Sequence, residues 1–142
     1  MTTVADVMTR GVRSMAPTDT VTQAAQAMDE LNVGVIPVCE GGKLVGMVTD
    51  RDIVVRAVAD GSQVSRPVRE IVTTGVVCAT PEMSTREANE LMSEHQVRRL
   101  PVVENGQLVG IVSLGDLAVK EGKDRRTGDT LQDISAGVKE RA

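Results

Sequence analysis

The sequence predicts a mixed α/β fold of the α+β type, built from two related units within one chain of 142 residues. Three observations predict it. The chain repeats itself once, each copy has two β-rich runs around a glycine-containing turn, and each copy has an amphipathic segment that opens on a helix-capping signal. We therefore expect each unit to hold a small three-stranded sheet and two main helices.

The repeat keeps one register without gaps when each residue n is aligned with residue n+64. Chance does not hold one register over such a length. The matched pairs include Thr9 and Thr73, Gly11 and Gly75, Pro37 and Pro101, Gly46 and Gly110, and Asp52 and Asp116. The sequence thus divides into a first unit (4–58), a linker (59–67), a second unit (68–121) and a C-terminal tail (122–142).

In the first unit the order is short helix, strand, helix, strand, strand, helix. Residues 11–15 are β-rich, and Thr20 with Gln23 forms a capping box for the next helix. The runs 35–39 and 44–49 flank "EGGK", a hairpin signal. The apolar stripe expected on the helix consists of Val21, Ala24, Ala25, Met28 and Leu31.

The second unit repeats this order. "STRE" supplies its capping box, and "RLPVV" and "LVGIVS" flank "ENGQ", whose Asn-Gly is the stronger hairpin signal. About 55 residues bury too little surface to be comfortable alone. We therefore expect the units to pack around a pseudo-twofold axis, so that any cleft between them occurs twice.

Composition excludes several classes of function. The chain contains no Phe, Tyr or Trp and has a net charge of −4, which opposes nucleic-acid binding by stacking or by a basic face. No stretch approaches the roughly 18 apolar residues needed to span a bilayer, and the start lacks a signal peptide's apolar core. We expect a cytoplasmic protein without a metal site, in which Cys39 and Cys78 are buried, reduced thiols.

The stretches "GMVTDRD" (46–52) and "GIVSLGD" (110–116) end in the same spacing of a hydroxyl residue and an Asp. One interpretation is structural, since Thr49 or Ser113 before a helix with Asp three residues later resembles a capping box. The other is functional, because a helix start can receive an anion and a carboxylate beside it can accept two hydrogen bonds from a ribose diol. The two interpretations are compatible.

The whole chain then resembles a known family. "NVGVIPVCEGGKLVGMVTDRD" and "HQVRRLPVVENGQLVGIVSLGD" look like cystathionine-β-synthase-type (CBS) domains, and two in tandem over about 4–121 resemble a free-standing bacterial-type CBS pair. The resemblance implies paired sheets that enclose two clefts. Such clefts often bind adenosine compounds such as AMP, ATP, NAD(H) or S-adenosylmethionine, with the motif Asp on the ribose.

The resemblance also implies that each cleft is lined by both units. The first cleft would combine Met47, Thr49, Arg51, Asp52, Cys78, Arg98 and Arg99. The second would combine Ser14, Gly34, Val35, Ile111, Ser113, Gly115 and Asp116.

The repeat predicts that these clefts are unequal, because Arg98 and Arg99 align with Gly34 and Val35. Guanidinium groups suit phosphate, so the first cleft should prefer a nucleotide and the second a less charged ligand or none. The alternative for the arginines is a solvated rim, or ion pairs with Glu94 or Glu104.

No catalytic constellation is apparent, since His95 is the only histidine and falls near a predicted helix end. The leading hypothesis is a regulatory module that needs no cofactor, binds an adenosine nucleotide and acts on a separate partner. The alternatives are a dimeric interaction or stress-related protein with empty clefts, and, ranked last, an enzyme acting on a nucleotide. The resemblance also implies a homodimer. The tail carries a thin apolar stripe of Leu131, Ile134 and Val138 on a short predicted helix.

Overall fold

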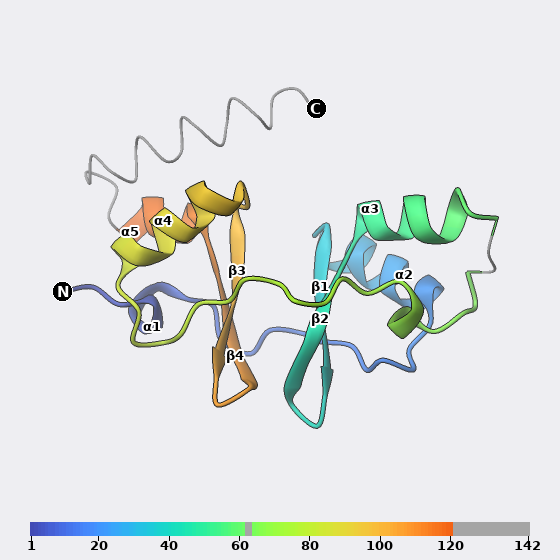
Figure 1. Ribbon diagram of the computed structural model, residues 1–142, viewed down its shortest axis with the longest axis horizontal. Helices are drawn as coiled ribbons and strands as arrows, with labels where there is room; N and C mark the ends of the chain where they lie inside the picture. The colour runs from blue at the N-terminus through green and yellow to red at the C-terminus, as the bar shows by residue number, and fades with distance from the viewer. Residues whose placement is uncertain (62–63, 121–142) are drawn as a thin grey trace. The chain divides into compact units, whose positions relative to one another are not determined.

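The protein combines short helices with antiparallel strands, as the sequence predicts (Figure 1). The computed structural model describes residues 1–61 and 64–120. Its elements are α1 (Val4–Val7), α2 (Val21–Leu31), β1 (Val35–Glu40), β2 (Lys43–Thr49), α3 (Asp50–Asp52), the π-helix η1 (Ile53–Val58), the 3₁₀ helix η2 (Val68–Glu70), α4 (Thr85–His95), β3 (Arg99–Glu104), β4 (Gln107–Ser113) and α5 (Leu114–Lys120). The tail stripe predicted at Leu131, Ile134 and Val138 lies outside the described residues.

The chain forms two compact units, and each contains the first segment of the other unit's sequence repeat. One unit is Arg13–Val76, and the other joins Met1–Val12 to the chain from Val77 onward. Helix α1, which opens the first sequence repeat, therefore packs with the second, and η2 packs with the first. The domain bounds 4–58 and 68–121 describe the sequence repeat and stay a prediction. The compact units of the structure have different bounds, because the chain passes from one unit to the other after Val12 and after Val76.

In the unit Arg13–Val76, β1 and β2 form an antiparallel hairpin. Gly41 and Gly42 form its turn with φ of 59° and 82°, a conformation that glycine adopts without strain. Met15 forms a single parallel bridge with β1 at Val38, at the position of the third strand predicted from the sequence. A further bridge joins Thr73 to Met47 on β2 and was not predicted.

The other unit has the same plan. Strands β3 and β4 pair around Asn105 and Gly106, which have φ of 52° and 81°. Ala79 pairs in parallel with β3, and Thr9 pairs with β4 at Ile111. Both kinds of bridge thus recur at positions related by the repeat.

Both predicted capping signals begin helices. Thr20 and Gln23 form the complete capping box of α2, and the Ser84 hydroxyl accepts a hydrogen bond from the Glu87 N–H at the start of α4. The predicted apolar stripe of α2 is wrong in part, because Ala25 and Leu31 are exposed while Ala27 is buried. Helix α2 therefore buries a narrower face, made of Val21, Ala24, Ala27 and Met28.

Each unit has its own apolar core. In Arg13–Val76 the buried side chains of α2, β1, β2 and η1 meet those of Val68 and Ile71. In the other unit, α1, α4, β3, β4 and α5 supply the core around Met92 and Leu100. Within 1–61 and 64–120, no helix is both long enough and apolar enough to cross a bilayer.

Candidate functional site

The turn that follows β2, which we call the Asp52 turn (Thr49–Asp52), is closed by a capping box. The Thr49 Oγ1 accepts a hydrogen bond from the Asp52 N–H at 3.0 Å, and the Thr49 N–H donates to Asp52 Oδ2 at 3.0 Å. These two bonds hold the carboxylate over the first turn of α3. The structural interpretation of this motif is therefore confirmed.

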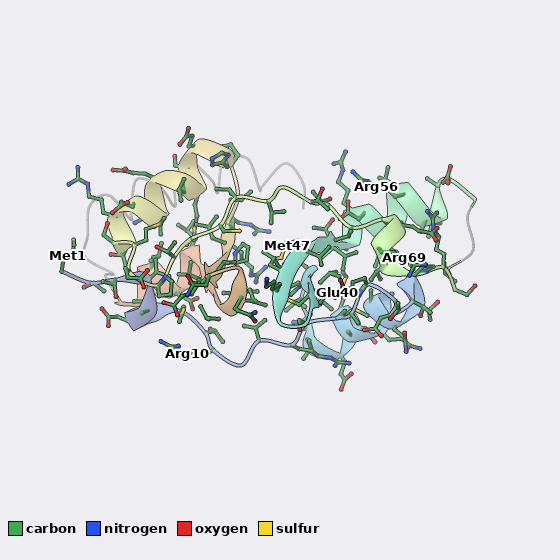
Figure 2. All side chains as sticks on the ribbon, turned by 60° about the horizontal axis from the view of Figure 1, so that its bottom comes forward. Met1, Arg10, Glu40, Met47, Arg56 and Arg69 are labelled. Carbon is green, nitrogen blue, oxygen red and sulfur yellow. The ribbon has the colours of Figure 1, made fainter. Side chains whose placement is uncertain are left out.

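Two further groups approach the Asp52 carboxylate. The Thr73 hydroxyl donates to both Oδ1 and Oδ2 at 3.2 Å, and Arg56 Nε lies 3.7 Å from Oδ1. Asp52 is only 8% exposed, so these neighbours replace water around a buried charge. Arg56 extends from η1 and Met47 lies on β2, as labelled in Figure 2.

The turn that follows β4, the Asp116 turn (Ser113–Asp116), repeats the capping geometry. Ser113 Oγ accepts from the Asp116 N–H at 3.0 Å, and the Ser113 N–H donates to Asp116 Oδ2 at 2.9 Å. Asp116 is half-buried. Across 1–61 and 64–118, no side chain donates a hydrogen bond to its carboxylate, and Thr9, the repeat counterpart of Thr73, makes no such bond.

The strand beside each turn brings different side chains to it. Val35 is the cross-strand partner of Thr49, whereas Arg99 is the partner of Ser113. Side chains of such partners lie on the same face of the sheet, so Arg99 shares a face with Ser113.

The residues before β1 and β3 also contact the turns. The Gly34 carbonyl accepts from the Asp50 N–H at 2.9 Å, and the Arg98 carbonyl accepts from the Leu114 N–H at 2.8 Å. Arg98 and its neighbour on β3 are both exposed, and neither forms an ion pair with another described residue. The ion pairs with Glu94 or Glu104 considered from the sequence are thus not formed there.

The other predicted site residues have distinct surroundings. Met47 is 6% exposed and pairs with Pro37 and Thr73. Cys39 is buried and Cys78 is only half-buried, and the two do not form a disulfide. Burial raises the pKa of each thiol, and a hydrogen bond with Ser14 opposes the rise at Cys39. Both sulfurs are therefore protonated at neutral pH and are poor nucleophiles.

Each compact unit contains some of the residues predicted for the first cleft and some of those predicted for the second. Arg13–Val76 holds Met47, Thr49, Arg51 and Asp52 with Ser14, Gly34 and Val35. The other unit holds Cys78, Arg98 and Arg99 with Ile111, Ser113, Gly115 and Asp116. The combination of residues from both units into one cleft stays a prediction.

Sequence reasoning missed Thr73 and Arg56 as partners of Asp52. For Thr73, the sequence feature that could have indicated a role is its match with Thr9 in the repeat. For Arg56, the feature is its position four residues after Asp52, which places the two side chains on the same side of a helix, one turn apart. In the described part of the chain, no group of His, Cys, Asp and Glu could hold a metal ion.

Comparisons with known proteins relate the two sequence repeats to a described domain. A model of the CBS domain matches residues 4–58 and 68–120. The CBS domain-containing protein YhcV of Bacillus subtilis is 47% identical over 135 residues, which cover 95% of this chain and 96% of that protein. The crystal structure of Hypoxic Response Protein I, with two coordinated zinc ions, is 38% identical, with a TM-score of 0.77 over 84% of this chain and 99% of that one.

Two other similar crystal structures contain adenosine compounds. CBSX2 in complex with AMP is 25% identical, with a TM-score of 0.77 over 87% of this chain and 98% of that one. The CBS domain pair of protein MJ0100, in complex with 5′-methylthioadenosine and S-adenosyl-L-methionine, is 27% identical, with a TM-score of 0.74 over 87% of this chain and 99% of that one.

Proposed function

Because this chain belongs to the CBS domain family, we propose that it is a cytoplasmic regulatory protein that binds an adenosine nucleotide and acts on a separate partner protein. The observation that carries the proposal is the pair of carboxylates, Asp52 and Asp116, each fixed beside a strand end by capping hydrogen bonds. Related structures hold AMP or S-adenosylmethionine, which supports an adenosine ligand here.

The chemistry of the two turns suits a ribose. An ionised carboxylate is an acceptor with about four lone-pair directions, and capping uses only one of them. Among the described residues, the remaining directions at Asp116 are open to both hydroxyls of a ribose diol, as at the acidic residue of dinucleotide-binding folds, whereas at Asp52 the Thr73 hydroxyl also reaches the carboxylate. Thr49 and Ser113 fix the carboxylates in place, so the protein loses little freedom when a ligand binds.

Calorimetric titration with AMP, ATP, NADH and S-adenosylmethionine tests the proposal. The chain has no Trp or Tyr, so binding must be followed by heat or by thermal stability and not by intrinsic fluorescence. We expect heat and a raised melting temperature with at least one compound, because a ligand that binds only the native state stabilises it. If none of the four compounds gives heat or raises the melting temperature, the adenosine proposal fails. The rival proposal, an interaction or stress-related protein with empty clefts, would then be favoured.

The same samples test the proposal that the protein is not an enzyme. The ligand recovered after prolonged incubation should be chemically unchanged when analysed by chromatography. Turnover of the bound nucleotide would favour the enzyme hypothesis instead.

We also propose a homodimer, the assembly that the family resemblance implies. One helix, η1, leaves Val54, Val55 and Val58 exposed at 56%, 51% and 58%, and contiguous exposed apolar side chains are typical of association surfaces. Light scattering should give the mass of two chains, and Val55→Glu should lower it towards one. An unaltered dimer in this variant would exclude η1 as the contact.

A further inference from the structure

Two donors already reach the Asp52 carboxylate within the unit Arg13–Val76, and Arg56 lies near it. Oδ2 accepts from the Thr49 N–H at 3.0 Å and from the Thr73 hydroxyl at 3.2 Å. Oδ1 accepts from the same hydroxyl at 3.2 Å and faces Arg56 Nε at 3.7 Å. The Thr73 hydroxyl lies equally close to both oxygens, so it covers the edge of the carboxylate at which a ribose diol would bond the two.

We infer that Thr73 is a latch on the Asp52 turn, whose hydroxyl must turn away from the carboxylate before a nucleotide ribose can bind there. This inference rests on the proposed function, since it concerns the same carboxylate. Thr73 thereby lowers the affinity of the Asp52 turn for its ligand, because the protein must give up a hydrogen bond before it gains those of the ribose.

Only the side chain of Thr73 is free to move. Its backbone is fixed to β2, where the Met47 N–H donates to the Thr73 carbonyl at 3.0 Å and the Thr73 N–H donates to the Met47 carbonyl at 2.9 Å. The Thr73 carbonyl also packs against Gly46, where an added Cβ would overlap it. Rotation about χ1 releases the hydroxyl without breaking either backbone bond, so the latch is a change of rotamer and not a movement of the segment.

The Asp116 turn provides a matched control. Thr9 pairs with Ile111 through the same two backbone bonds, at 2.8 and 3.0 Å, and so occupies the position that corresponds to Thr73. As far as the described residues go, however, Asp116 accepts only the Ser113 N–H. Loss of the Thr9 hydroxyl should therefore leave ribose binding at Asp116 unchanged.

The test is a calorimetric titration of AMP into Asp116→Ala and into Asp116→Ala with Thr73→Val. Valine keeps the shape of threonine but donates no hydrogen bond, so AMP should bind about three- to tenfold more tightly to the double variant. The control pair is Asp52→Ala with and without Thr9→Val, which should differ by less than about twofold. Unchanged or weaker binding after Thr73→Val would overturn the inference, since Thr73 would then assist the carboxylate and not compete for it.

Failure of the proposed function gives a different result. If the wild-type chain binds no adenosine compound, the proposed function fails. The contact between Thr73 and Asp52 can then be tested by the free energy of unfolding in urea of Thr73→Val, Asp52→Asn and the double variant. Additive destabilisation would show that the two side chains are not coupled and would overturn the latch. If the wild type binds AMP but Asp116→Ala does not, binding belongs to the other turn and the latch on Asp52 is likewise excluded.

Discussion

The Asp52 turn and the Asp116 turn share a hydroxyl residue, a carboxylate three residues later and the same two capping hydrogen bonds, at 2.9 to 3.0 Å. They differ in what else reaches the carboxylate. Asp52 is buried against Thr73 and Arg56, whereas Asp116 is half-buried and receives no side-chain donor from the residues described. The repeated motif thus fixes the position of the carboxylate. Tertiary contacts then decide whether its oxygens are available to a ligand.

The largest expected difference between the two turns is in nucleotide affinity. If Asp52 holds the ribose in the cleft predicted to prefer phosphate, Asp52→Ala should remove its hydrogen bonds and weaken AMP binding by about 2–4 kcal/mol, roughly 30- to 1000-fold. Asp116→Ala should weaken it much less, because the sequence assigns no guanidinium to its cleft. Calorimetry of the two variants checks this, and equal losses would refute the predicted inequality.

The assignment of Arg98 and Arg99 to the phosphate of a nucleotide held at Asp52 can be tested separately. Replacing both with Ala should weaken AMP binding about 10- to 100-fold, a total loss of about 1.4–2.7 kcal/mol, because both side chains are exposed and water partly replaces the charge-assisted hydrogen bonds. Binding of adenosine, which has no phosphate, should be unchanged.

A control for the loss of an arginine outside the predicted cleft is Arg86→Ala, because Arg86 is exposed on α4 and pairs with Glu90 at 3.4 Å. This variant should bind AMP as the wild type does. If adenosine and AMP lose affinity equally in the arginine double variant, the two arginines do not contact a phosphate.

The backbone of Thr73 pairs with β2 and that of Thr9 with β4, and both pairings need a glycine, Gly46 or Gly110, on the strand. A Cβ at Gly46 would overlap the Thr73 carbonyl oxygen and lie 2.9 Å from Val72 Cγ2, whereas one at Gly110 would meet the Thr9 carbonyl at 2.7 Å and the flexible Met8 Sδ at 2.9 Å. Gly46→Ala should therefore lower the free energy of unfolding by about 1–3 kcal/mol and Gly110→Ala by less. Urea unfolding followed by circular dichroism measures both, and a greater loss at Gly110 would contradict the comparison.

The parts of this fold that the sequence predicts are those with local causes. The hairpin turns at Gly41–Gly42 and Asn105–Gly106 require positive φ, and the capping boxes place hydroxyl and acidic or amide side chains three residues apart. Each signal lies within a few residues of its effect. The helices, the hairpins and the two carboxylates could therefore be predicted without a structure.

Contacts between distant segments could not be predicted in this way. Thr73 lies 21 residues from Asp52, and no periodicity links a hydroxyl on one segment to a carboxylate on another. The exchange of α1 between the repeats has the same cause, since its partners lie beyond the linker. The stripe on α2 failed for a related reason, because tertiary packing decides that Ala27 is buried and Ala25 is exposed.

The smallest expected difference concerns the capping hydroxyls themselves. Thr49→Val and Ser113→Ala each remove the acceptor of one helix N–H, and loss of such a cap costs about 0.5–2 kcal/mol. The cost should be greater at Thr49, because the Asp52 residue whose N–H loses its partner is only 8% exposed, while water can reach the half-buried Asp116. Urea unfolding of the two variants measures the difference. If the Ser113 variant is the less stable, burial does not determine the strength of these caps, and the contrast between the turns is confined to what reaches the carboxylate oxygens.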